Sequence, residues 1–143
     1  MNSHDAVFLD TSGWIASLDT DDRWHARAVE EYGRLGASGR PFVTTDWVIA
    51  ETGNGLARVK VRRRFPDAVK RFFASPNCRL IRVDEKLFHE ALELYRRSDD
   101  KSWGLVDCAS FIVMRQECIL DAFTTDQHYQ QAGFRPLLAA KPR

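Results

Sequence analysis

Short apolar runs alternate along the chain with segments in which apolar residues recur every three or four positions. The apolar runs predict strands at residues 6–9, 42–44, 79–83, 122–124 and 134–138. The first run is closed by Asp10, two hydroxyl residues and Gly13, which is typical of a buried strand that leads directly into a helix. Pro136 restricts the last run to the edge of a sheet, because proline has no backbone N–H to donate to a second neighbour.

Helical periodicity fills the segments between these strands. Helices are expected over residues 12–18, 24–35, 85–95 and 105–118, after Thr45 or Asp46, from Pro66, and briefly after Asp126. We expect Thr11 or Ser12 to cap the first helix and Asp84 to cap the helix over 85–95. Because strands and helices alternate throughout, the sequence predicts an α/β fold. Its sheet is mainly parallel and covered on both faces, in one domain over residues 1–143.

The composition narrows the class of protein. Lys plus Arg number 21 and Asp plus Glu number 20, so the net charge of +1 gives no general attraction for a polyanion. The three cysteines form no CxxC pair and support neither a disulfide framework nor a zinc site. Cys108 and Cys118 lie in apolar segments, where we expect them to pack as small hydrophobic residues. With no signal peptide and no membrane-spanning run in the sequence, we expect a cytoplasmic protein.

Four carboxylates stand at positions where a solvated helix or strand face is a poor explanation for an acidic residue. Asp10 and Asp126 each follow an apolar strand, Asp107 lies one turn into the most apolar helix, and Glu51 lies in the helix after the second strand. An ionised carboxylate near a core is costly unless it is paired or bound to a cation. We therefore expect the four to meet at one edge of the sheet. Two alternatives stay open: the two strand-end acids are helix caps, and the glutamate is a surface residue.

Acids gathered in this way indicate a hard divalent cation. Clustered carboxylates raise one another's pKa, and bound Mg²⁺ or Mn²⁺ removes that cost through oxygen ligands. Such an ion activates water and stabilises the charge of a phosphoryl displacement. A carboxylate pocket without histidine or cysteine favours phosphodiester chemistry over zinc hydrolysis. His25, His89 and His128 show no metal-ligand spacing, and we expect them to be structural or surface residues.

Four segments of the chain carry a resemblance to a known family. They are Phe8-Leu9-Asp10-Thr11-Ser12, Ala50-Glu51-Thr52, residues 102–110 around Asp107, and residues 123–129 with Gly133-Phe134. In this order, and over nearly the whole chain, they resemble the PIN-domain nucleases, in particular the VapC-type toxins of bacterial toxin–antitoxin pairs. One departure is Gly104, at a position where many relatives carry serine.

The resemblance implies a compact three-layer α/β/α fold and a Mg²⁺- or Mn²⁺-dependent endoribonuclease. It implies that Asp10 and Asp107 bind the metal, that Glu51 and Asp126 complete the catalytic pocket, and that Ser12 hydrogen-bonds within it. It also implies an RNA substrate, a homodimer and a cognate antitoxin protein that covers the site. The small size favours the toxin type over a PIN nuclease with an RNA-processing role.

Rival interpretations differ in what they require of the sequence. A haloacid-dehalogenase-type phosphatase needs a second acid where this chain has Ser12. A binding module that keeps the fold without the chemistry is disfavoured, because all four acids are present. RNA contact is a hypothesis for the basic segment at residues 60–71 and for Trp14, Trp47 and Trp103. A solvated helix end and packed core residues explain them equally well.

Overall fold

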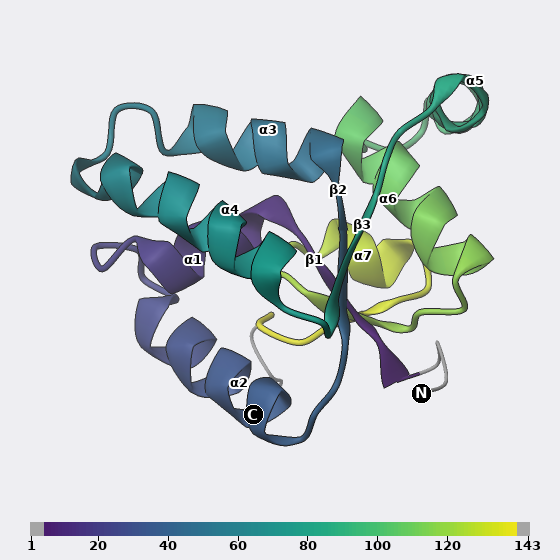
Figure 1. Ribbon diagram of the computed structural model, residues 1–143. Helices are drawn as coiled ribbons and strands as arrows, with labels where there is room; N and C mark the ends of the chain where they lie inside the picture. Colours follow the sequence, from purple (N-terminus) through teal and green to yellow (C-terminus); the bar gives the residue numbers. More distant parts are fainter. Residues whose placement is uncertain (1–4, 140–143) are drawn as a thin grey trace.

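The computed structural model describes residues 5–139, and within this range a single parallel sheet forms the centre of the molecule (Figure 1). Its strands are β1 (Val7–Leu9), β2 (Phe42–Thr45), β3 (Cys78–Ile81), β4 (Asp121–Phe123) and β5 (Arg135–Pro136). The strand order is β3-β2-β1-β4-β5, and every neighbouring pair is parallel. The predicted parallel sheet is confirmed, and Pro136 lies on an edge strand as expected.

Helices cover both faces of the sheet and make the three-layer α/β/α arrangement that was expected. They are α1 (Thr11–Leu18), α2 (His25–Ala37), α3 (Asp46–Gly55), α4 (Arg64–Ala74), α5 (Glu85–Arg97), α6 (Leu105–Gln116) and α7 (His128–Gln131). Figure 1 shows α1, α2 and α4 on one side of the sheet and α5 and α6 on the other. Thr45 caps α3 and Asp84 caps α5, both as predicted.

The central strand β1 owes its position to complete burial. Val7 and Phe8 have no exposed surface, and the strand pairs with β2 on one side and β4 on the other. Gly13 then brings α1 very close to β4. A Cβ atom added at this glycine would lie 2.1 Å from the carbonyl oxygen of Phe123. Only glycine allows this approach, which sets how the end of β1 faces the end of β4.

A cluster of charged side chains lies at the start of β4, the end of the strand opposite to Phe123. Asp121 is 4% exposed and accepts hydrogen bonds from Arg40 Nη2 at 2.8 Å and Arg135 Nε at 2.6 Å. Asp121 pairs with Val7 at the start of the two central strands. The two arginines therefore neutralise an acid that is remote from the carboxyl ends of the strands.

The helix predicted over 105–118 ends two residues early. Cys118 adopts a φ of 56°, and Ile119 N–H donates to the carbonyl oxygen of Met114 at 2.8 Å, which closes a Schellman-type turn. Cys118 is exposed, so the expectation that it packs as a buried hydrophobic residue is wrong. Cys108, by contrast, is buried as predicted.

One further expectation about helices needs correction. The fourth helix begins at Arg64 rather than at Pro66, because a 3-10 turn over Lys60–Arg63 leads straight into it.

The apolar sides of α2 and α4 are only partly buried. Their exposed members are Val29 at 50%, Tyr32 at 43% and Phe73 at 59%.

An apolar cleft of about 730 Å³ lies between α1, α2 and α4, and Val29 and Tyr32 belong to its lining. Across residues 5–139, none of the helices is both long enough and apolar enough to cross a bilayer.

Candidate active site

Asp10 lies at the carboxyl end of β1, in the N-cap position of α1, and is 3% exposed. Its carboxylate makes no side-chain capping bond. It accepts three hydroxyl hydrogen bonds instead: from Ser12 at 3.0 Å and Thr124 at 2.7 Å to Oδ2, and from Tyr129 at 2.9 Å to Oδ1. The expectation that Thr11 or Ser12 caps α1 is therefore wrong, because both hydroxyls donate to carboxylates.

Two backbone N–H groups donate to the hydroxyls of this network. Thr125 N–H donates to Ser12 Oγ at 3.0 Å, and Asp126 N–H donates to Thr124 Oγ1 at 3.0 Å. The two hydroxyls also lie 2.8 Å from each other, so Ser12, Thr124 and Asp10 Oδ2 are mutually hydrogen-bonded. Burial raises the pKa of Asp10, and the hydroxyl donors act to lower it. The turn after β4 is therefore arranged to hold a buried carboxylate.

Asp107 lies in the first turn of α6, where the resemblance places it. Its Oδ2 accepts from the backbone N–H of Gly104 at 3.0 Å, so the residue also closes the start of the helix. Burial raises the pKa of Asp107 to about 6, against the lowering effect of the Gly104 bond. The negative charges of Asp10, Asp126 and Glu51 add to the rise. One carboxylate therefore experiences the charge of all three others.

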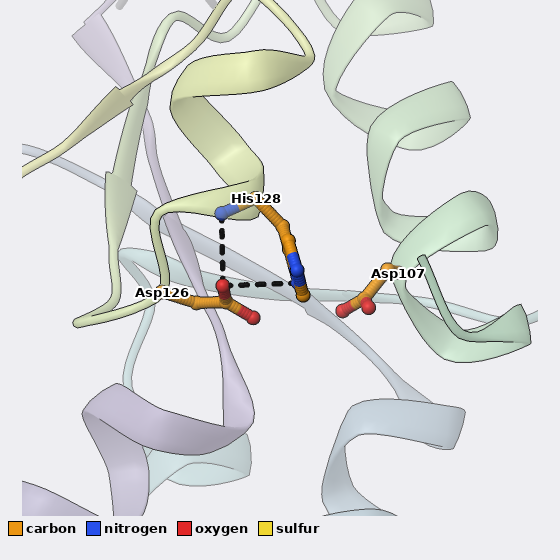
Figure 2. Close-up of side chains that lie close together, drawn as sticks. All are labelled: Asp107, Asp126 and His128. Carbon is orange, nitrogen blue, oxygen red and sulfur yellow. Dashed lines mark hydrogen bonds and ion pairs between the residues drawn. The ribbon is translucent and has the colours of Figure 1, made fainter. Parts of the chain in front are cut away.

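Asp126 and His128 stand opposite Asp107 at the end of β4 (Figure 2). Asp126 Oδ1 accepts from the backbone N–H of His128 at 2.8 Å and lies 3.1 Å from its Nδ1. The other ring nitrogen, Nε2, lies 2.9 Å from Ser102 Oγ. Within residues 5–139, one group of potential metal-ligand atoms lies within 4.8 Å of one another: those of Asp107, Asp126 and His128.

Glu51 is the most solvent-exposed of the four acids and projects from α3. Thr11 Oγ1 donates a 2.6 Å hydrogen bond to its Oε1. Thr11, the first residue of α1, therefore holds the Glu51 side chain, which would otherwise be free to move on the surface. Its charge reaches Asp107, as the pKa of that residue shows.

The charges of Asp10, Glu51 and Asp126 all act on Asp107, so the four predicted acids lie at the same edge of the sheet as Ser12. Asp10 and Glu51 are not in the described group of ligand atoms within 4.8 Å of one another, which Asp107 and Asp126 form with His128.

The helix-cap alternative does not account for Asp10, whose side chain makes no capping hydrogen bond. It does describe Asp126, whose Oδ1 accepts from the backbone N–H of His128 at the start of α7. Sequence reasoning missed His128, because no second histidine or cysteine stands at metal-ligand spacing. The available signal was its place two residues after Asp126, in the turn that follows a strand.

The proposed RNA-stacking residues are packed into the protein. Trp14 is 7% exposed and contacts Phe72, with ring centroids 5.8 Å apart. Trp103 packs edge-on against Phe111 at 5.0 Å and donates from Nε1 to Gln131 at 3.1 Å. These contacts favour the core interpretation over base stacking.

The basic segment lies on the surface, and its contact with RNA stays a hypothesis. Its exposed cations are Lys60, Arg62, Arg63, Arg64, Lys70 and Arg71. They follow α3 on the 3-10 turn and on α4.

Comparison with known proteins decides the family. The model of the PIN domain matches residues 7–135. The chain belongs to the PIN-domain family. It is also 34% identical over 129 residues to the 23S rRNA-specific endonuclease VapC20 of Mycobacterium tuberculosis, in both the H37Rv and CDC 1551 strains. The match covers 90% of this chain and 95% of the relative.

A solved structure agrees with the sequence comparison. The crystal structure of M. tuberculosis VapC20, described as a Sarcin-Ricin loop cleaving toxin, superposes with a TM-score of 0.77 at 32% identity. The alignment covers 90% of this chain and 95% of that structure. The expectation of a PIN-domain endoribonuclease of the VapC type is confirmed.

Proposed function

We propose that this PIN-domain nuclease cleaves RNA with a divalent cation bound by Asp10 and Asp107. Glu51 and Asp126 complete the catalytic pocket, and Ser12 supports it by orienting Asp10. The observation that carries the proposal is the state of Asp107, whose pKa of about 6 reflects burial and the charges of three neighbouring carboxylates. Such repulsion is unfavourable unless a cation enters the cluster.

The donor atoms fit Mg²⁺ or Mn²⁺. The cluster offers carboxylate oxygens from four residues, and hard cations of this kind prefer a few carboxylates with water completing the shell. When bound, the ion supplies Lewis-acid stabilisation of the phosphoryl oxygens and lowers the pKa of water. His128 adds a nitrogen beside Asp107 and Asp126, a ligand that Mn²⁺ accepts more readily than Mg²⁺.

The residues around the ion have separate tasks. Asp10 is buried, and its carboxyl group is oriented by three hydroxyl groups. Glu51 is the accessible carboxylate, and one of its oxygens is already held by Thr11. We assign to its other oxygen the orientation of the attacking water. That water adds to phosphorus, the bond from phosphorus to the leaving oxygen breaks, the water's proton passes to a carboxylate, and the leaving oxygen takes a proton from solvent water.

Ribosomal RNA is the substrate class that we propose. VapC20, of which the match covers 95%, is named as a 23S rRNA-specific endonuclease. Its structure is described as that of a Sarcin-Ricin loop cleaving toxin. RNA loops expose unpaired bases that a protein reads more easily than a duplex. We place the protein in the cytoplasm, where ribosomes are accessible to it.

A cognate antitoxin and a second copy of the chain are the proposed protein partners. The apolar cleft between α1, α2 and α4 offers a surface for an amphipathic helix, with Arg40 and Arg71 in its lining. Co-expression with the neighbouring gene product and an RNA cleavage assay test the inhibition. Equal cleavage with and without that protein contradicts it, and sedimentation of the chain alone tests the homodimer.

Cleavage of ribosomal RNA tests the proposed function. The chain is incubated with ribosomes and with total RNA, in Mg²⁺ and then in EDTA, beside the variants Asp10→Asn and Asp107→Asn. We expect discrete cuts that require Mg²⁺ and fall by at least about 100-fold in either variant. Cuts confined to transfer or messenger RNA contradict the substrate class. Intact RNA throughout supports the interpretation of an inactive binding module.

A further inference from the structure

Tyr129 lies beneath the carboxylate cluster and is the largest fully buried side chain among the described residues, with no exposed surface. Its ring packs edge-on against Phe111 of α6, with centroids 4.9 Å apart. A phenylalanine would satisfy that packing. The hydroxyl is therefore the part of this residue that needs an explanation, because a buried phenol requires hydrogen-bond partners.

The two oxygens of Asp10 are not equivalent. Oδ2 accepts from both Ser12 and Thr124, whereas Oδ1 accepts from Tyr129. A carboxylate oxygen has about two lone-pair sites. Oδ2 is therefore the more crowded of the two oxygens, and the phenol contacts the other one.

The same side chain contacts the helix that carries Asp107. Its ring packs against Phe111, which lies about one turn after Asp107 on α6. Tyr129 thus contacts both the end of β1 and the middle of α6. These two elements supply the two carboxylates proposed as metal ligands.

We propose that Tyr129 is a positioning residue for metal binding, whose phenol orients Asp10 Oδ1 for a divalent ion that Asp10 shares with Asp107. The proposal rests on the metal-dependent function proposed above. Partners that orient a metal ligand typically change metal affinity or activity by about 10–100-fold when they are removed. Burial raises the pKa of Tyr129 well above its usual range, so the phenol keeps the proton that it donates.

Manganese binding by Tyr129→Phe tests the proposal without RNA. This variant keeps the ring against Phe111 and removes only the hydroxyl. Tyr95→Phe is the matched control, because Tyr95 is 53% exposed on α5. Free Mn²⁺ is measured by electron paramagnetic resonance during titration of each full chain. We expect equal affinity in the wild type and Tyr95→Phe, and about tenfold weaker binding or more in Tyr129→Phe.

A second readout separates positioning from simple stability. RNA cleavage by Tyr129→Phe is expected to recover as Mn²⁺ is raised, with an unchanged KM for RNA. A variant with a lower melting temperature in EDTA but unchanged Mn²⁺ affinity would overturn the proposal. Failure of the wild type itself to bind Mn²⁺ would instead overturn the proposed metal-dependent function.

Discussion

The Thr11 hydroxyl donates a 2.6 Å hydrogen bond to Glu51 Oε1 and thereby joins the first residue of α1 to the middle of α3. The two residues are 40 positions apart in the chain. A single hydrogen bond to an exposed glutamate adds little to the stability of the fold, but this one fixes the direction of the other carboxylate oxygen of Glu51.

Removal of that hydroxyl is expected to slow RNA cleavage without preventing it. In Thr11→Val the Glu51 side chain becomes mobile, and we expect a rate loss of up to about tenfold. Glu51→Gln, which removes the charge itself, should cost considerably more. Single-turnover cleavage rates of both variants check this order. Equal rates for Thr11→Val and the wild type would show that the contact does not orient Glu51.

The raised pKa of Asp107 predicts how metal binding depends on pH. The carboxylate must be ionised to bind a cation, and its pKa is about 6. We therefore expect Mn²⁺ affinity to fall as the pH drops through 6 and to be constant above pH 7.5. Asp126→Asn removes one of the neighbouring charges and should move the midpoint to lower pH. A midpoint near pH 4 in the wild type would contradict the clustering.

The raised pKa of Asp107 also predicts that removal of its charge stabilises the fold, although the same change abolishes activity. Because folding raises the pKa of Asp107 from 3.8, its ionisation destabilises the metal-free fold. This cost is absent below pH 3.8 and complete above about pH 6. Asp107→Asn removes the charge, and we expect it to increase the free energy of unfolding at pH 7.5 by about 1 kcal/mol, allowing for solvent screening. Urea unfolding in EDTA measures it. A loss of stability at pH 7.5 would contradict this account.

The predictable part of the site consisted of residues attached to regular elements. Asp10 ends a strand whose apolar run is unmistakable, and Asp107 interrupts the most apolar helix. Parallel strands place their carboxyl ends at one edge, so the meeting of Asp10 and Asp126 followed from the order of elements alone.

The rest depended on side-chain directions that no spacing encodes. Ser12 and Thr11 have the composition of helix caps, but burial of Asp10 and the position of α3 draw their hydroxyls to carboxylates. His128 and Tyr129 lie in the short helix that follows Asp126. The His128 ring faces Asp107 and Asp126, whereas the Tyr129 ring is buried in the core.

The close approach at Gly13 predicts a sharp loss of stability on adding a methyl group. Its Cβ would lie 2.1 Å from the Phe123 carbonyl oxygen, so Gly13→Ala must push α1 away from β4. We expect a loss of about 2 kcal/mol in the free energy of unfolding and weaker metal binding, since Asp10 and Thr124 separate. Gly36→Ala is the control, because nothing lies within 4 Å of the added atom. Equal effects of the two changes would contradict this packing.

The charge cluster at Asp121 should affect stability and leave the metal site intact. Asp121→Asn removes the charge that neutralises Arg40 and Arg135, and we expect a loss of about 2 kcal/mol in the free energy of unfolding. Mn²⁺ affinity should not change, because this residue lies at the other end of β4. Thermal or urea unfolding and a Mn²⁺ titration check the two parts separately. Weaker Mn²⁺ binding in a folded variant would show that the two ends are coupled.

Crystals grown with Mn²⁺ test the central claim most directly. The anomalous scattering of manganese locates the ion independently of activity. The account predicts a peak contacted by Asp10 Oδ1 and by the Asp107 carboxylate, which disappears in Asp107→Asn. A peak held by Asp126 and His128 without Asp10, or no peak at millimolar Mn²⁺, would contradict it.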